Sequence, residues 1–177
     1  MSRITAGIQV VCGLLIIFSP LAAQESTLIE FKLKDQFDRE YSSESWQGNI
    51  LIVIGSDREG SQYNERWGEA IHKALADSPG FSHVQFVGVA DLRGVPFFLK
   101  GFVKGKFPED RSKWLLMDWK GIFAQSYQFK DDVSNIVIFA PGGERLLQKT
   151  VTELDPVALD EIVQTVKAQM DMLAHEK

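Results

Sequence analysis

The chain has 177 residues, of which 19 are Lys or Arg and 24 are Asp or Glu, so its formal net charge is −5. This length is typical of one domain with a substantial core, and the apolar fraction of 45% excludes a disordered or low-complexity chain. The acidic balance argues against nucleic acid as the main partner.

The first residues differ from the remainder of the chain. Arg3 is the only charge in residues 1–23, an apolar run IQVVCGLLIIF follows, and SPLAA precedes Gln24. This pattern is typical of a secretory signal peptide, and the apolar run is shorter than the roughly 20 residues of a membrane-spanning helix. We therefore expect residues 1–23 to be a cleaved signal peptide and residues 24–177 to form one domain exported to the bacterial periplasm. Membrane association is expected only if the signal segment is retained.

Cysteine usage excludes thiol chemistry from the processed chain. The single cysteine, Cys12, lies in the segment that cleavage would remove. The processed chain would have no disulfide and no thiolate nucleophile, although its compartment permits disulfides. Loss of Arg3 would leave 18 basic against 24 acidic side chains, a net charge of −6.

Apolar runs and polar breaks alternate along the chain as in α/β proteins. Several runs are continuously apolar, which is typical of strands covered on both faces. The predicted strands are residues 28–33, 50–54, 84–90, 114–117, 136–139 and 145–149. With no repeat and no linker between them, they predict a single layered sheet domain.

Two long helices and one short one are predicted between and after these strands. In the first, Tyr63, Trp67 and Ile71 share one face, and Ser56 with Glu59 fits a capping box, with Ser61 as a second possible cap. A short helix is expected within residues 96–104. The last helix is predicted to begin with Asp155 as its cap and Pro156 in its first turn.

Three blocks of sequence resemble the redoxin branch of the thioredoxin-like superfamily, which includes peroxiredoxin-like and cytochrome-maturation-type exported thioredoxins. The blocks are FKLKDQFDREYSSESWQGNILIVI, WLLMDWKGIFAQSYQF and VSNIVIFAPGGERLLQ, and they cover most of residues 28–150 in the family's order. The resemblance implies an α/β, single-domain thioredoxin-like fold, with a central mixed sheet and helices on both faces. Fold alone does not imply function.

The resemblance also shows where this chain departs from the family. It places Glu59 to Gln62 where a thioredoxin-type enzyme has Cys-x-x-Cys, and a carboxylate or an amide cannot attack a disulfide or a peroxide. Ser134 stands where the family has a cis-proline. Because a non-proline cis bond costs about 2.5–4 kcal/mol, we expect the bond between Val133 and Ser134 to be trans.

The predicted binding site is a groove at this former active-site turn. Its expected residues are Ser56, Asp57, Arg58, Glu59, Gly60, Ser61, Gln62, Val133 and Ser134. The local alternative is that the acids of the turn only cap the helix and complement its dipole. Asp91 and Arg93 follow a predicted buried strand, and they either help to line a pocket beside the turn or form a local ion pair.

A second candidate surface lies in the segment GVPFFLKGFVKGKFPEDRSKW, which mixes aromatic and basic residues. Its candidate residues are Phe98, Lys100, Phe102, Lys104 and Lys106. The segment would suit an anionic membrane or an acidic partner, or its phenylalanines would anchor the chain to the sheet while its lysines are solvated.

These observations favour an exported, redox-inactive thioredoxin-like protein that binds or scaffolds a protein or peptide partner. We expect no cofactor and no metal, because the three histidines stand apart from other ligand residues. One alternative is an enzyme in which Glu59 or Asp57 acts as acid or base and Arg58 or Arg93 holds an anionic substrate. Another is an accessory factor for a partner that supplies the thiols.

Overall fold

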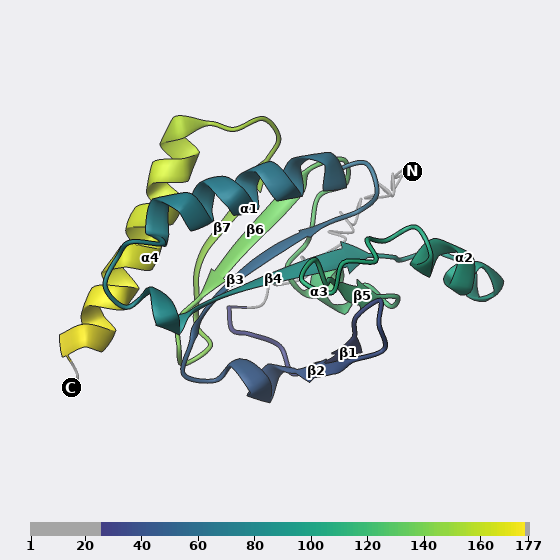
Figure 1. Ribbon diagram of the computed structural model, residues 1–177, viewed down its shortest axis with the longest axis horizontal. Helices are drawn as coiled ribbons and strands as arrows, with labels where there is room; N and C mark the ends of the chain where they lie inside the picture. The colour runs from purple at the N-terminus through teal and green to yellow at the C-terminus, as the bar shows by residue number, and fades with distance from the viewer. Residues whose placement is uncertain (1–25, 176–177) are drawn as a thin grey trace, which may run out of the picture.

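The computed structural model describes residues 26–175, so the predicted signal peptide of residues 1–23 lies outside the described part. Its centre is a five-stranded sheet in the order β5-β4-β3-β6-β7 (Figure 1). The strands are β3 (Ile50–Ser56), β4 (Val84–Asp91), β5 (Leu116–Asp118), β6 (Ser134–Phe139) and β7 (Arg145–Val151). β3 pairs parallel with β4 and antiparallel with β6, β4 pairs parallel with β5, and β6 pairs antiparallel with β7, so the sheet is mixed.

The sequence of the middle strand, β3, accounts for its central position in the sheet. Every one of its residues is buried, as its continuous apolar run predicts. Ile50, Ile52 and Ile54 pack into the core on one face of the sheet, whereas Leu51 and Val53 pack into the core on the other face. β3 therefore ends inside the molecule, and the turn that follows it starts from a fixed point.

Two long helices cover one face of the sheet: α1 (Ser61–Leu75) and α4 (Pro156–His175). Trp67 of α1 is completely buried, and its indole N–H donates to the carbonyl of Thr152 at 2.7 Å. Asp155 caps α4 by accepting from the amide of Ala158 at 2.7 Å, which confirms the predicted start of that helix.

The opposite face is covered by shorter pieces. These are the antiparallel pair β1 (Lys32–Lys34) and β2 (Glu40–Ser42), the 3₁₀ turn η1 (Ser43–Trp46), and helix α3 (Ile122–Ser126). Phe31, Trp46, Phe123 and Tyr127 are buried among them. The predicted class, an α/β domain with a mixed sheet and helices on both faces, is confirmed.

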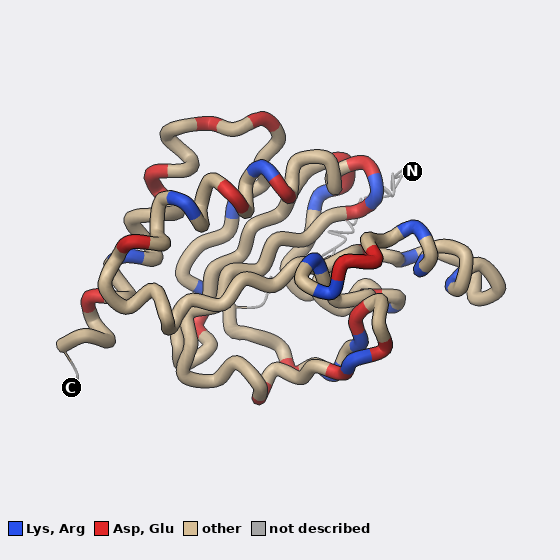
Figure 2. The backbone as a smooth tube through the Cα atoms, in the orientation of Figure 1, with Lys and Arg blue, Asp and Glu red and all other residues tan. Residues whose placement is uncertain are grey.

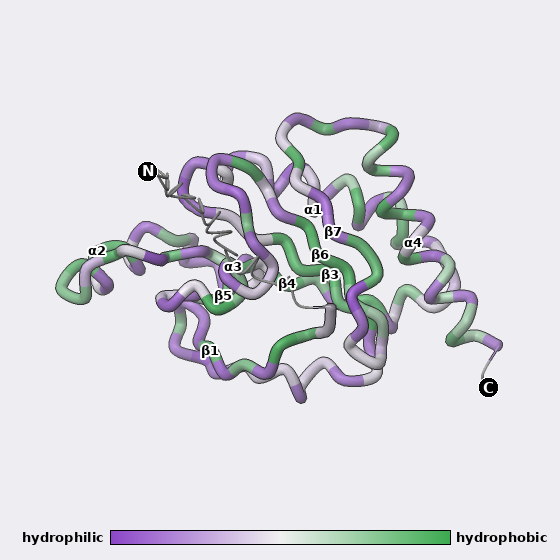
Figure 3. Tube along the Cα trace, turned by 180° about the vertical axis from the view of Figure 1, so that it is seen from behind, coloured by the Kyte–Doolittle hydropathy of each residue, from purple (hydrophilic) through white to green (hydrophobic). Residues whose placement is uncertain are grey.

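An arm leaves the sheet after β4 and returns at β5. It contains the 3₁₀ turn η3 (Phe97–Leu99) and helix α2 (Lys100–Lys104), where a short helix was expected. Figures 1 and 3 show from opposite sides that α2 projects away from the body of the domain. Another 3₁₀ turn, η2 (Phe81–His83), joins α1 to β4. No helix within residues 26–175 is both long enough and apolar enough to cross a membrane.

Candidate functional site

The turn between β3 and α1 is closed by Asp57. One carboxylate oxygen accepts from the amide of Gly60 at 2.8 Å, and the other accepts from the amide of Asp132 at 3.0 Å. No side chain caps α1, so the predicted capping box of Ser56 and Glu59 is wrong. The Ser56 hydroxyl instead accepts from the amide nitrogen of the Asn64 side chain at 2.8 Å. Asp57 therefore joins the turn to the loop before β6.

The turn and that loop are in direct contact at Gly60. A Cβ atom at Gly60 would lie 2.2 Å from the carbonyl oxygen of Val133, so only glycine fits there without movement. Ser134 is completely buried. The predicted groove between the Glu59 turn and Ser134 is therefore closed, because backbone packs against backbone at that point. No cis peptide bond occurs in the described residues, so the Val133–Ser134 bond is trans, as expected.

Asn135, which was not predicted from the sequence as a site residue, holds the loop before β6 in place. Its side-chain amide donates to the carbonyls of Lys130 at 2.9 Å, Gly55 at 3.3 Å and Val133 at 3.3 Å. Its oxygen accepts from the amide of Lys130 at 2.8 Å. Because buried amides must be hydrogen-bonded, this residue holds the loop against the end of β3.

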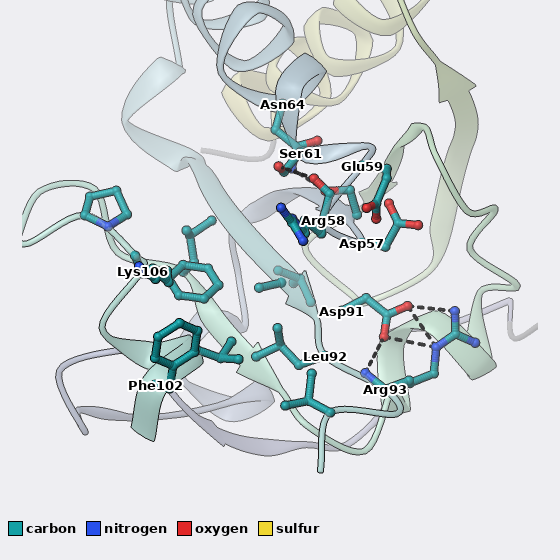
Figure 4. Close-up of a pocket in the computed structure, with 18 residues that line it drawn as sticks. Asp57, Arg58, Glu59, Ser61, Asn64, Asp91, Leu92, Arg93, Phe102 and Lys106 are labelled. Carbon is teal, nitrogen blue, oxygen red and sulfur yellow. Dashed lines mark hydrogen bonds and ion pairs between the residues drawn. The ribbon is translucent and has the colours of Figure 1, made fainter. Parts of the chain in front are cut away.

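A cavity of about 920 Å³, which we call the turn cavity, opens on the other side of the turn (Figure 4). It brings together three stretches that the sequence marked separately: the turn, the end of β4, and the arm. They contribute Ser56, Asp57, Arg58, Glu59, Ser61 and Asn64 from the turn and the start of α1; Val89 to Arg93 and Val95 from β4 and beyond; and Phe102, Val103, Lys106, Phe107, Pro108 and Leu115 from the arm and its return.

Not every predicted site residue reaches this cavity. Gly60, Gln62, Val133 and Ser134 of the expected groove do not line it, and neither do Phe98, Lys100 and Lys104 of the arm. Gly60 is buried against Val133, Gln62 is exposed on α1, and Lys104 pairs with Asp38 at 2.6 Å. The site is thus displaced from the expected groove toward β4 and the arm.

The charges around the turn cavity are of two kinds. Asp91 and Arg93 form a tight ion pair, with a guanidinium nitrogen 2.7 Å from the carboxylate, and this hydrogen bonding raises the pKa of Arg93. The two residues therefore both line the cavity and brace each other. Arg58 is exposed, and its backbone carbonyl accepts from the hydroxyl of Ser61 at 2.6 Å. Its guanidinium has no hydrogen-bond or ion-pair partner among residues 26–175, and Figure 4 shows it extending over the cavity.

The arm side of the turn cavity is apolar with one cation. Val103 and Phe107 of the arm line the cavity together with Val89 of β4 and with Leu92, which follows β4. The ammonium group of Lys106 lies 4.8 Å from the ring centroid of Phe102, a cation–π contact. An apolar surface flanked by Arg58 and Lys106 suits a ligand with an apolar group and a negative charge.

The carboxylates around the turn cavity do not favour the alternative of an acid/base enzyme. Both carboxylate oxygens of Asp57 already accept backbone amides, so this residue holds the turn together. A raised carboxyl pKa is found at Asp118, where burial is the main cause. Asp118 does not line the turn cavity, and its oxygens accept from the amides of Ile122 and Phe123, both at 2.9 Å.

Three carboxylates near the turn form a small acidic cluster. Asp57, Glu59 and Asp132 can each offer one oxygen, and these oxygens lie within 4.8 Å of one another. The cluster contains no histidine or cysteine, and Asp57 and Asp132 are already linked through a backbone hydrogen bond. We assign no metal to it.

No protein-family model matches the chain, and no curated protein matches it by sequence. Solved structures do resemble it. The pneumococcal exposed lipoprotein thioredoxin Etrx1 from Streptococcus pneumoniae has a TM-score of 0.57 at 14% identity, with 79% of this chain and 99% of that chain covered. A SCO1/SenC family lipoprotein from Bacillus anthracis has a TM-score of 0.53 at 15% identity, with 81% and 94% covered.

A third solved structure, a secreted disulfide oxidoreductase from Mycobacterium tuberculosis homologous to DsbE of Escherichia coli, has a TM-score of 0.51 at 16% identity, covering 78% of this chain and 95% of that one. Likeness at this level of identity shows the fold and not the activity. This chain therefore has a thioredoxin-like fold, and its sequence, with Cys12 as the single cysteine, contains no Cys-x-x-Cys.

Proposed function

We propose that this protein is an exported, redox-inactive thioredoxin-like protein that binds a protein or peptide partner in the turn cavity. The observation that carries the proposal is the cavity itself. By the resemblance, it lies beside the turn that carries Cys-x-x-Cys in thioredoxin-type enzymes, where this chain has Glu59 and Gln62. A partner would then bind beside the former active-site turn, and no thiol chemistry would be needed.

The walls of the turn cavity define the class of segment that it would take. Its volume of about 920 Å³ accommodates a few side chains of a peptide but not a folded domain. Val89, Leu92 and Val103 would contact an apolar side chain, while Arg58 and Lys106 would pair with a nearby carboxylate. An extended segment with an apolar anchor and an acidic residue meets both conditions.

Export rests on the sequence and is supported by the structural comparisons. The pattern of residues 1–23 is that of a signal peptide, and two of the resembling structures are described as lipoproteins and one as secreted. The chain would then meet its partner outside the cytoplasm. N-terminal sequencing of the exported protein should give Gln24 as the first residue, and a start at Met1 would refute processing.

The proposal is tested by photo-crosslinking in the native compartment. A photoreactive residue at Glu59 or at Lys106, on opposite sides of the turn cavity, should give a discrete adduct with one protein partner. The matched control is the same residue at Ala168, which is exposed on α4, and it should give no such adduct. Equal labelling from Ala168, or no adduct from either cavity position, would refute binding through this cavity.

A further inference from the structure

The arm carries an unusual concentration of exposed apolar side chains. Phe97 is 85% exposed, Phe98 80% and Phe102 66%, and Leu99 between them is 39% exposed. Among the described residues, the other exposed large apolar side chains are Val157 and Met172, both on α4. Adjacent exposed aromatic rings of this kind mark an interaction surface more often than ordinary solvent-facing surface.

Basic side chains lie next to these rings. The ammonium group of Lys100 is 5.9 Å from the ring centroid of Phe97 and 5.0 Å from that of Trp119, and Lys106 lies over Phe102. Within residues 26–175, neither lysine forms an ion pair, so both charges are available to a partner. Figure 2 shows Lys and Arg but no Asp or Glu along the outer part of the arm, in a chain of net charge −5.

The shape of the arm decides between partner classes. A peptide needs a groove in which to bury its side chains, whereas here α2 projects from the domain (Figures 1 and 3), and Phe97 and Phe98 just before it are 85% and 80% exposed. A projecting aromatic tip with lysines beside it fits a lipid interface, because the rings can enter the headgroup region while the lysines remain among anionic headgroups.

We propose that the outer face of the arm, formed by Phe97, Phe98, Phe102, Lys100 and Lys106, binds the surface of an anionic lipid bilayer. Phe102 and Lys106 also line the turn cavity, whereas Phe97, Phe98 and Lys100 do not. The inference rests mainly on these last three residues and does not depend on the proposed peptide binding. Because α2 forms one wall of the turn cavity, a bilayer-bound arm would hold that cavity close to the membrane.

The arm is held firmly enough to present these side chains. Lys104 pairs with Asp38 at 2.6 Å, and Lys113 pairs with Glu65 at 2.8 Å. At its return to the sheet, the Gln36 side chain donates to the carbonyl of Lys113 at 2.9 Å. A surface that is ordered before binding loses less conformational entropy when it meets its partner.

The test is vesicle co-sedimentation of the exported protein, with all variants prepared in the same form so that the N-terminal segment contributes equally. Vesicles of phosphatidylcholine alone are compared with vesicles of phosphatidylcholine and phosphatidylglycerol in equal parts. We expect binding to the anionic vesicles, weakened about tenfold for each phenylalanine in Phe97→Ser and Phe98→Ser. Lys100→Ala and Lys106→Ala should each weaken it about fivefold at low salt.

Matched controls separate this surface from general hydrophobicity and charge. Val157→Ser removes an apolar side chain that is 76% exposed on α4, and Lys73→Ala removes an exposed lysine of α1. Neither should change vesicle binding. Circular dichroism should show that the variants stay folded, since the substituted phenylalanines are exposed.

Three results would overturn the inference. One is no binding of the full protein to anionic vesicles. Another is equal binding by the arm variants and the controls, which would place the lipid contact elsewhere in the chain. The last is an arm that binds poly-glutamate or a second copy of this chain, seen in sedimentation velocity, but not vesicles, which would make the arm a protein interface.

Discussion

Replacement of Gly60 by alanine is the sharpest test of how the former active-site turn is built. The new Cβ atom would lie 2.2 Å from the carbonyl oxygen, 2.6 Å from the carbonyl carbon and 2.8 Å from the amide nitrogen of Val133. These are rigid backbone atoms, and Asn135 holds their loop in place from the other side. The added methyl can be accommodated only if the turn and the loop separate.

The expected cost follows from the contacts that separation would break. Overpacking by a single methyl in a rigid setting costs about 1–3 kcal/mol. The separation would also stretch the hydrogen bond from the amide of Asp132 to Asp57, which is 3.0 Å long and lies at the surface, so it adds only a fraction of the usual value for a charged acceptor. We therefore expect the free energy of unfolding to fall by about 1–3 kcal/mol.

The assay is equilibrium unfolding in urea, with Gly101→Ala as the matched control. A Cβ at Gly101 would meet no atom within 4 Å, and the residue lies in α2, so alanine there should be neutral or stabilising by up to about 1 kcal/mol. If Gly60→Ala is as stable as the parent chain, the turn does not pack on Val133, and the groove that we regard as closed is open.

Three further outcomes are expected. Burial raises the pKa of Asp118, so this carboxyl stabilises the folded state less as pH rises from 3.8 through the folded value. The substitution Asp118→Asn should therefore lower the free energy of unfolding more near pH 4 than at pH 7, as measured by urea titration. An equal loss at both pH values would contradict a pKa raised by burial. Lys104 lowers the pKa of Asp38, so the ion pair that ties the arm to Asp38 is present above pH 3.8 and is lost as pH falls through the lower folded value. The protection of the α2 amides against hydrogen exchange, relative to their intrinsic rates at each pH, should fall there, and unchanged protection would count against this role. Glu59→Cys combined with Gln62→Cys should form a reducible disulfide, seen as two thiols alkylated only after reduction, and failure to close would mean that the turn has been placed wrongly along the chain.

The long elements could be predicted from sequence because their patterns are strong. β3 and β6 each contain a continuous apolar run, residues 50–54 and 136–139, and α1 and α4 have clear helical spacing. Their class and order followed directly. The pieces that were missed, such as β2 and α3, have only three and five residues, too few to show a period, and tertiary contacts decide their conformation.

The sequence predicted several residues of the candidate site but not how they are arranged in space. The sequence left open whether Asp91 and Arg93 line a pocket beside the turn or form a local ion pair, and the structure shows both. They lie near the turn because the carboxyl ends of neighbouring parallel strands meet at one edge of a sheet. That Asp57, and not Ser56, would close the turn depends on where the amide of Asp132 lies in space. The burial of Ser134 likewise depends on the loop before β6, whose path a single sequence does not specify.

The claim that most needs testing is that the turn cavity holds a partner. The direct measurement compares photo-crosslinking from Glu59 in the parent chain with that in a Val103→Trp variant, in which a half-buried wall residue is enlarged so that it obstructs the cavity. Ala168→Trp on α4 is the control. We predict that the adduct is lost in Val103→Trp and retained in Ala168→Trp, with both proteins folded. An adduct of equal yield from the obstructed and the open cavity would show that the partner binds elsewhere.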